Sequence, residues 1–257
     1  MAGLEHDIER ALVAAGDELN SLLYHPSYQV LSALLKNPAF DESKLTLLLG
    51  RKDAPVELLE EIGTRKTLLK NYAVKRALIF HPRTPRLIGL RLIRDLYVMD
   101  LVQLALSPAA SMELRRLAEE QLIARLPQLP LGQRITLARR GPARVAGALL
   151  AQGNAQVLPI ALNNSFLTES QILKVLAREK IAPQVAQAIA NHPKWSQSYN
   201  VRLALVRTPT APLAIVLGFL PQLTVSDLRE LTSPGIIPEN LRRYLQAEVQ
   251  RRIRTGK

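Results

Sequence analysis

Histidine is the residue type in this chain with the clearest capacity for metal binding or acid–base chemistry. Three of the four histidines, His25, His81 and His192, stand directly before a proline. Because proline restricts the residue before it and ends a helix, we expect these side chains to lie at helix ends and to hydrogen-bond exposed carbonyl groups there. No two histidines are four residues apart, the spacing of two ligands on one helix face. The pattern favours a structural role over a metal site or a general base.

Other residue types that could carry chemistry are absent or poorly placed. The chain has no cysteine, which excludes thiolate nucleophiles, disulfides and cysteine-bound metal clusters. It has neither of the glycine-rich loops that hold phosphates. The carboxylate pairs Glu60-Glu61 and Glu119-Glu120 fall on expected helices beside basic residues, where a solvated face is the favoured interpretation. We therefore expect no catalytic residue, no metal site and no cofactor.

Arginine is the residue type that points most directly to a partner. No acidic residue occurs in the stretch Gln121–Thr168, and such a basic stretch could contact phosphates. Ordinary solvated arginines are the alternative interpretation. The single tryptophan could anchor a partner or instead fill a groove between helices. The candidate binding surface is Arg115, Arg116, Arg134, Arg139, Arg140, Arg144, Trp195, Arg242 and Arg243.

Composition predicts a helical protein with uneven charge. Of 257 residues, 47% are apolar but only 4% are aromatic, which favours helix packing over sheets. The net charge of +12 divides into −6 for residues 1–62 and +18 for the rest, which suggests an anionic partner, an acidic segment folded against the basic one, or simple solubility. The polar start and the short apolar runs predict a cytoplasmic protein without membrane insertion.

The chain contains one stretch twice. Residues 72–126 align without a gap on residues 199–253, so that Tyr72 meets Tyr199 and Pro82 meets Pro209. The shared positions are mainly apolar or turn-forming, which indicates a repeated packing unit. The expected segments are an acidic N-terminal helical cap at 1–62, a first repeat unit at 63–126, middle repeats at 127–198, and a second copy of the unit with the C-terminal helix at 199–257.

Several expected helices end in His-Pro, Asn-Pro or Thr-Pro and restart within a few residues. Val74–Pro85 and Tyr199–Pro212 resemble the repeat of the leucine-rich-repeat-variant and HEAT-like bacterial proteins, which reads roughly Val-Arg-x-Ala-Leu-x-x-Asn-Pro-x-Thr-Pro. The resemblance implies an all-α fold, a right-handed α-solenoid of stacked short helix pairs that binds macromolecules. The variant family's founding member also holds an iron–sulfur cluster on cysteines, and a chain without cysteine cannot hold it in that way.

These observations lead to one expected function and two alternatives. The first is a non-enzymatic scaffold that binds a protein partner. The second is binding of nucleic acid through the basic surface of residues 63–257. The third is an enzyme similar to the HEAT-like DNA glycosylases, which the scarcity of aromatic residues disfavours.

Overall fold

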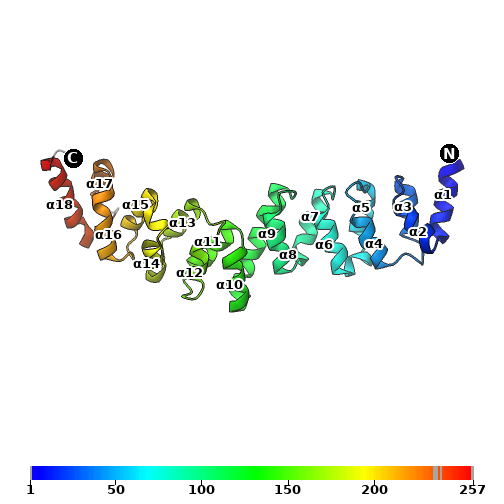
Figure 1. The fold of residues 1–257 in the computed structure, drawn as a ribbon, viewed down its shortest axis with the longest axis horizontal. Coiled ribbons are helices and arrows are strands. Elements are labelled where there is room, and N and C mark those ends of the chain that lie inside the picture. Colours follow the sequence, from blue (N-terminus) through cyan, green and yellow to red (C-terminus); the bar gives the residue numbers. More distant parts are fainter. Residues whose placement is uncertain (1, 234–236, 238, 256–257) are drawn as a thin grey trace. The chain divides into compact units, whose positions relative to one another are not determined.

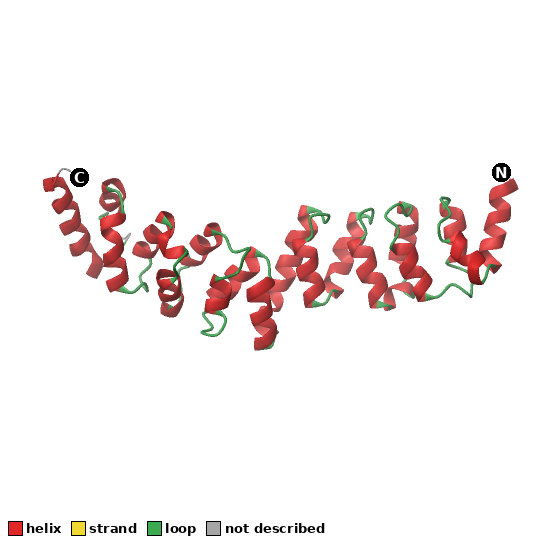
Figure 2. Ribbon diagram, viewed as in Figure 1, coloured by secondary structure: helices red, strands yellow, loops and turns green. Residues whose placement is uncertain are grey.

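The structure is a computed structural model that describes residues 2–233, 237 and 239–255. The described residues form helices joined by short loops, without a strand (Figure 2). This confirms the all-α prediction. The chain divides into two compact units, an N-terminal unit of residues 1–122 and a C-terminal unit of residues 123–257. The boundary lies inside a helix, a few residues before Leu126–Gly132, where two prolines and a glycine in seven residues predict a joint.

In the N-terminal unit, several helices pack on the next helix but one. Helix α1 packs on α3, α3 packs on α5, and α4 packs on α6 (Figure 1). Two short 3-10 helices cover Leu68–Lys70 and Ile93–Asp95. The α-helices are α1 (Ala2–Val13), α2 (Gly16–Leu22), α3 (Tyr28–Leu34), α4 (Glu42–Leu49), α5 (Val56–Thr64), α6 (Tyr72–Phe80), α7 (Arg86–Leu92), α8 (Val98–Leu106) and α9 (Met112–Arg125).

The C-terminal unit follows the same plan. Helices α10, α12 and α14 pack in one row, and α11, α13 and α15 pack in a second row. Short 3-10 helices cover Leu126–Gln128, Trp195–Gln197 and Leu220–Gln222. The α-helices are α10 (Leu131–Arg140), α11 (Ala143–Ala151), α12 (Leu158–Leu162), α13 (Glu169–Leu176), α14 (Pro183–Asn191), α15 (Tyr199–Arg207), α16 (Leu213–Phe219), α17 (Val225–Leu231) and α18 (Glu239–Thr255).

The duplication extends well beyond the stretch 72–126 that sequence identity reveals. When Tyr72 is placed on Tyr199 and the same shift is kept along the chain, α4 to α7 coincide with α13 to α16 at both ends, as do the 3-10 helices between them. Helices α8 and α9 also begin at the same positions as α17 and α18. The predicted agreement of helix order between 72–126 and 199–253 is therefore confirmed for the described residues. The two units are two copies of one helical plan.

Aliphatic side chains fill the core of each unit at matched positions. Leu58 and Ile62 of α5 are fully buried, as are Val185 and Ile189 at the same places in α14. Small changes of shape between aliphatic residues preserve the packed volume, so the helix positions can persist while identities change. Among the described residues no helix is long and apolar enough to cross a membrane.

The helix cap that the sequence predicts at Thr84 is not formed. The sequence predicts Thr84 as the N-cap before Pro85, but α7 begins at Arg86 with Pro85 in the N-cap position. The Thr84 hydroxyl instead donates a hydrogen bond of 2.6 Å to the Leu78 carbonyl in the last turn of α6. A threonine in a short connection can bond to either neighbouring helix, and here it serves the helix before it.

Candidate functional site

A buried asparagine fastens the turn after α3 to the end of α1, and a second one fastens the turn after α12 to the end of α10. The Asn37 side chain donates to the carbonyls of Ala11 and Ala14 at 2.8 and 2.9 Å, and its Oδ1 accepts from the Ala39 N–H at 2.7 Å. Asn164, at the matching position of the other copy, makes the same three bonds at 2.7–3.0 Å. Both side chains are almost completely buried. These carbonyls would otherwise lie unbonded in the core, so the asparagines have a structural role in both units.

The histidines before proline use the same turn geometry. In His25, His81 and His192, Nδ1 accepts from the backbone N–H two residues later at 3.1–3.3 Å. This contact differs from the carbonyl bonds that the sequence suggests, although Nε2 of His81 does lie 2.6 Å from the Arg51 carbonyl. All three histidines lie at or just after helix ends, as predicted.

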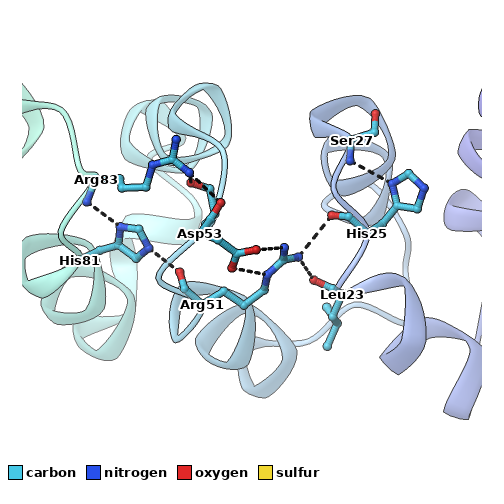
Figure 3. A network of polar contacts seen from close by, with 8 residues as sticks. Leu23, His25, Ser27, Arg51, Asp53, His81 and Arg83 are labelled. Carbon is cyan, nitrogen blue, oxygen red and sulfur yellow. Dashed lines mark hydrogen bonds and ion pairs between the residues drawn. The ribbon is translucent and has the colours of Figure 1, made fainter.

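In the N-terminal unit, the loops that follow α2, α4 and α6 are joined by a continuous polar network (Figure 3). Arg51, after α4, donates to the carbonyls of Leu23 and His25 after α2, and pairs with Asp53 at 2.9 Å. The Arg51 carbonyl lies against His81 after α6. The Arg51 side chain is only 9% exposed. We call the set Leu23, His25, Arg51, Asp53, His81 and Arg83 the loop network; Arg83 completes it by donating to the Asp53 carbonyl at 2.8 Å.

A tyrosine–aspartate pair occurs at matched places in both units. Tyr72 donates to Asp100 and accepts from the Tyr97 N–H at 3.0 Å. Tyr199 donates to Asp227 and accepts from the Thr224 N–H at 2.9 Å. Burial and the bond to Asp100 raise the pKa of Tyr72 to about 12, so its hydroxyl remains a donor at neutral pH. The pairs connect α6 to α8 and α15 to α17.

The loop network has no counterpart in the C-terminal unit. Arg178 occupies the position of Arg51, but Lys180 replaces Asp53 and Thr208 replaces His81. Without the aspartate, Arg178 is exposed, and none of the described residues pairs with its side chain. The loop after α13 therefore lacks the side-chain contacts that Arg51 and Asp53 make after α4.

An open groove lies beside Arg178, between α13 and α15. Its volume is 510 Å³, and its floor includes Leu173, Leu176 and Leu203. Arg178 and Arg207 stand at the end where both helices terminate. We call this site the C-terminal groove; its lining is Leu173, Leu176, Ala177, Arg178, Glu179, Asn200, Leu203, Ala204, Arg207, Thr208 and Pro209.

The same positions of the N-terminal unit carry different side chains. Leu173 corresponds to Thr46, Leu203 to Arg76, and Arg207 to Phe80. The Arg76 guanidinium lies 5.2 Å from the centre of the Phe80 ring and forms an ion pair of 2.7 Å with Asp100. Sequence reasoning missed the groove, although the alignment of the two copies displays the signal: a polar and an aromatic residue of one copy become leucine and arginine in the other.

The candidate arginines lie in both units. Arg115 and Arg116 are on α9 of the N-terminal unit, where Arg116 is exposed and pairs with Glu120 at 3.1 Å. In the C-terminal unit, Arg139 and Arg140 are exposed in the last turn of α10, and Arg144 is half-buried on α11. Arg134 and Arg242 are also half-buried, and Arg243 on α18 is exposed. Among the candidate arginines of the C-terminal unit, Arg139, Arg140 and Arg243 are therefore the most exposed.

Trp195 lies inside the C-terminal unit. It is 4% exposed, and its Nε1 donates to the Leu162 carbonyl at 2.9 Å. Lys194 lies over the indole ring at 4.2 Å. Of the two interpretations, these contacts match a side chain that fills the space between helices, because a buried indole with a satisfied N–H has no free face for a partner.

Charge separates the two units sharply. Residues 1–122 hold 16 basic and 16 acidic side chains, whereas residues 123–257 hold 18 basic and 6 acidic ones. The whole net charge of +12 thus belongs to the C-terminal unit, which also contains the groove. The C-terminal unit is the part of the chain that would attract an anionic partner.

The described residues contain no group of three or more histidine and carboxylate side chains that could hold a metal ion. No family model, curated protein or solved structure matches this chain. The function must be inferred from the two copies of the helical plan and from the features that differ between them.

Proposed function

We propose that this protein is a non-enzymatic helical-repeat scaffold, a right-handed α-solenoid of the HEAT-like or leucine-rich-repeat-variant type, that binds a protein partner. In support, several helices of each unit pack on the next helix but one, the arrangement expected of stacked helix pairs. The duplicated plan supports the proposal further, because repeat arrays grow by copying packing units.

The C-terminal groove is the observation that carries the proposal. Its lining includes the half-buried Leu173 and Leu203 where the N-terminal copy has Thr46 and the paired Arg76. Apolar concavities with a few polar groups at the rim are typical binding sites. At this place one copy of the plan therefore presents aliphatic side chains, and the other presents polar ones.

A capture experiment with a matched pair of variants tests the proposal. Leu203→Arg introduces the residue that the N-terminal copy has at this position, and Arg76→Leu makes the reverse change. We expect the wild-type protein, immobilised and exposed to nuclease-treated extract of its own cell, to retain a protein that Leu203→Arg loses and Arg76→Leu keeps. Equal capture by the wild-type protein and Leu203→Arg would contradict this use of the groove.

The charge of the C-terminal unit favours one second candidate, binding to the backbone of nucleic acid. A surface that neutralises several phosphates binds with an affinity that falls steeply as salt rises. Through Arg139 and Arg140 we expect only non-specific binding, with a dissociation constant of roughly 10⁻⁴ to 10⁻⁶ M. Titration of labelled duplexes at low and physiological salt measures it. Nanomolar binding at physiological salt that Arg139→Glu with Arg140→Glu abolishes would place nucleic acid ahead of a protein partner.

A further inference from the structure

The C-terminal groove has chemically different ends. At the end where α13 and α15 begin, Asn200 donates to the Glu169 carboxylate at 2.7 Å. At the end where they terminate stand Arg178 and Arg207, with Lys180 exposed close by in sequence. The leucines of the floor lie between these ends. A ligand in the groove would therefore meet a negative group at one end and positive groups at the other.

The cations at the basic end differ in how much charge they offer. Arg207 forms an ion pair of 2.8 Å with Glu230, in which both side chains are more than 40% exposed. Glu179 also lines the rim and offsets part of the charge. Arg178 has no partner among the described residues, whereas its counterpart Arg51 bonds to two carbonyls and to Asp53. Arg178 is therefore the guanidinium that is available to a ligand.

The lining of the groove also indicates the class of ligand. Its apolar surface is made of leucine, alanine and proline, without an aromatic ring. Bases of single-stranded nucleic acid bind mainly by stacking on aromatic rings, so this floor does not suit them. Aliphatic floors accept aliphatic side chains, and a free guanidinium binds a carboxylate with two parallel hydrogen bonds.

We propose that the C-terminal groove binds a peptide segment that carries a leucine-like side chain next to an aspartate or glutamate. The aliphatic side chain lies on Leu173, Leu176 and Leu203, and the carboxylate pairs with Arg178 at the basic end. The net charge of the C-terminal unit favours the approach of such an acidic segment. This inference rests on the proposed scaffold function and specifies the chemistry of its partner.

The test is a selection from a displayed library of random peptides on the intact protein. Peptides that also bind Leu203→Arg are removed, so that the remaining pool depends on the groove. Leu173→Thr, which introduces the residue of the N-terminal copy, is a second groove variant. Circular dichroism and thermal unfolding first establish that both variants are folded.

We expect the groove-dependent pool to be rich in aspartate or glutamate beside leucine, isoleucine, methionine or phenylalanine. Fluorescence anisotropy with labelled peptides from the pool should show about tenfold weaker binding to Arg178→Ser, and a similar loss when the peptide's glutamate becomes glutamine. The matched control Lys52→Ser, at an exposed position beside Arg51 in the N-terminal unit, should leave the affinity unchanged.

Three outcomes would overturn the inference without deciding the proposed function. The first is a groove-dependent pool without acidic residues, the second is unchanged affinity for Arg178→Ser, and the third is the absence of any groove-dependent pool. The capture experiment with Leu203→Arg decides the proposed function separately, because it depends on the partner and not on a peptide. Loss of that capture together with a neutral or basic peptide pool would keep the scaffold and exclude the acidic segment.

Discussion

The loops after α4 and α13 stand at the same place in the two copies of the helical plan and have opposite designs. After α4, Arg51 is enclosed by carbonyls and Asp53, and the loop network joins the loops that follow α2, α4 and α6. After α13, Arg178 is exposed beside an open groove. Lys180 stands where the other copy has Asp53, so the anion that pairs with Arg51 is absent beside Arg178. The comparison teaches that the same helices can support either a closed loop surface or an available one.

The hydrogen bonds of the buried Asn37 and Asn164 are the same in the two units. We expect their loss to have the largest effect on the free energy of unfolding. Asn37→Ala and Asn164→Ala should each destabilise their own unit by about 3 kcal/mol, because two buried carbonyls and a turn N–H lose their partner. Urea unfolding followed by hydrogen exchange of each unit measures this, with the exposed Asn20→Ala as the control. A loss below about 1 kcal/mol in either unit would mean that the turn tolerates an unbonded carbonyl better than its burial suggests.

The second prediction separates the two arginines. Arg51→Ala should lower the free energy of unfolding by about 2 kcal/mol, because it removes charged hydrogen bonds from the carbonyls of Leu23 and His25. Arg178→Ala should change the free energy of unfolding by less than about 0.5 kcal/mol, as expected for an exposed side chain without a partner among the described residues. Denaturant unfolding of the two variants gives both values. Equal losses of unfolding free energy in the two variants would contradict the difference between an enclosed Arg51 and an exposed Arg178.

Helix capping gives a third, smaller difference between the copies. Asp41 caps α4 by accepting from the Lys44 N–H at 2.9 Å, whereas the matched Thr168 makes no side-chain bond to α13. Asp41→Ala should therefore destabilise the N-terminal unit by about 1 kcal/mol, and Thr168→Ala should cost only a few tenths. Thermal unfolding of the two variants side by side is the measurement. A larger loss for Thr168→Ala would show that its hydroxyl caps the helix in solution.

The smallest expected effect concerns pH in the C-terminal unit. Burial and, less strongly, Lys194 lower the pKa of His192 from its ordinary value of 6.5. The unfolded chain then binds more protons than the folded one, so the contribution of His192 to stability is fully present above pH 6.5 and is lost as the pH falls through and below it. Fluorescence of Trp195, whose ring centre lies 6.3 Å from that of His192, reports unfolding of this unit.

The control for this prediction is His192→Asn, which keeps the turn bond in the form that Asn37 and Asn164 use. Unfolding of the wild-type protein and of the variant is compared at mildly acidic and mildly alkaline pH. The difference between the two proteins should grow in favour of the variant as the pH falls. A constant difference would exclude His192 as the titrating group.

The sequence predicts the helical class well because proline turns and aliphatic spacing are local signals. The copy at 199–253 is visible because tyrosine, proline and arginine are shared with 72–126. The earlier part of the duplication is hidden, since Leu45 becomes Ile172 and Leu48 becomes Val175, exchanges that preserve packing but not identity. The loop network could not be predicted, because it depends on which loops lie side by side. The signal of the groove becomes visible only when α4 and α6 are aligned with α13 and α15.

The spans of the polar contacts have a consequence for how this chain folds. Asn37 and Asn164 reach carbonyls 23 and 26 residues earlier, and the Trp195 bond spans 33 residues. Contacts so close in sequence require only short loops to close, and proteins built from such contacts fold fast for their size. Each helix pair can therefore dock on the pair before it as soon as it forms. We expect folding to proceed by growth from neighbour to neighbour, without waiting for distant parts of the chain.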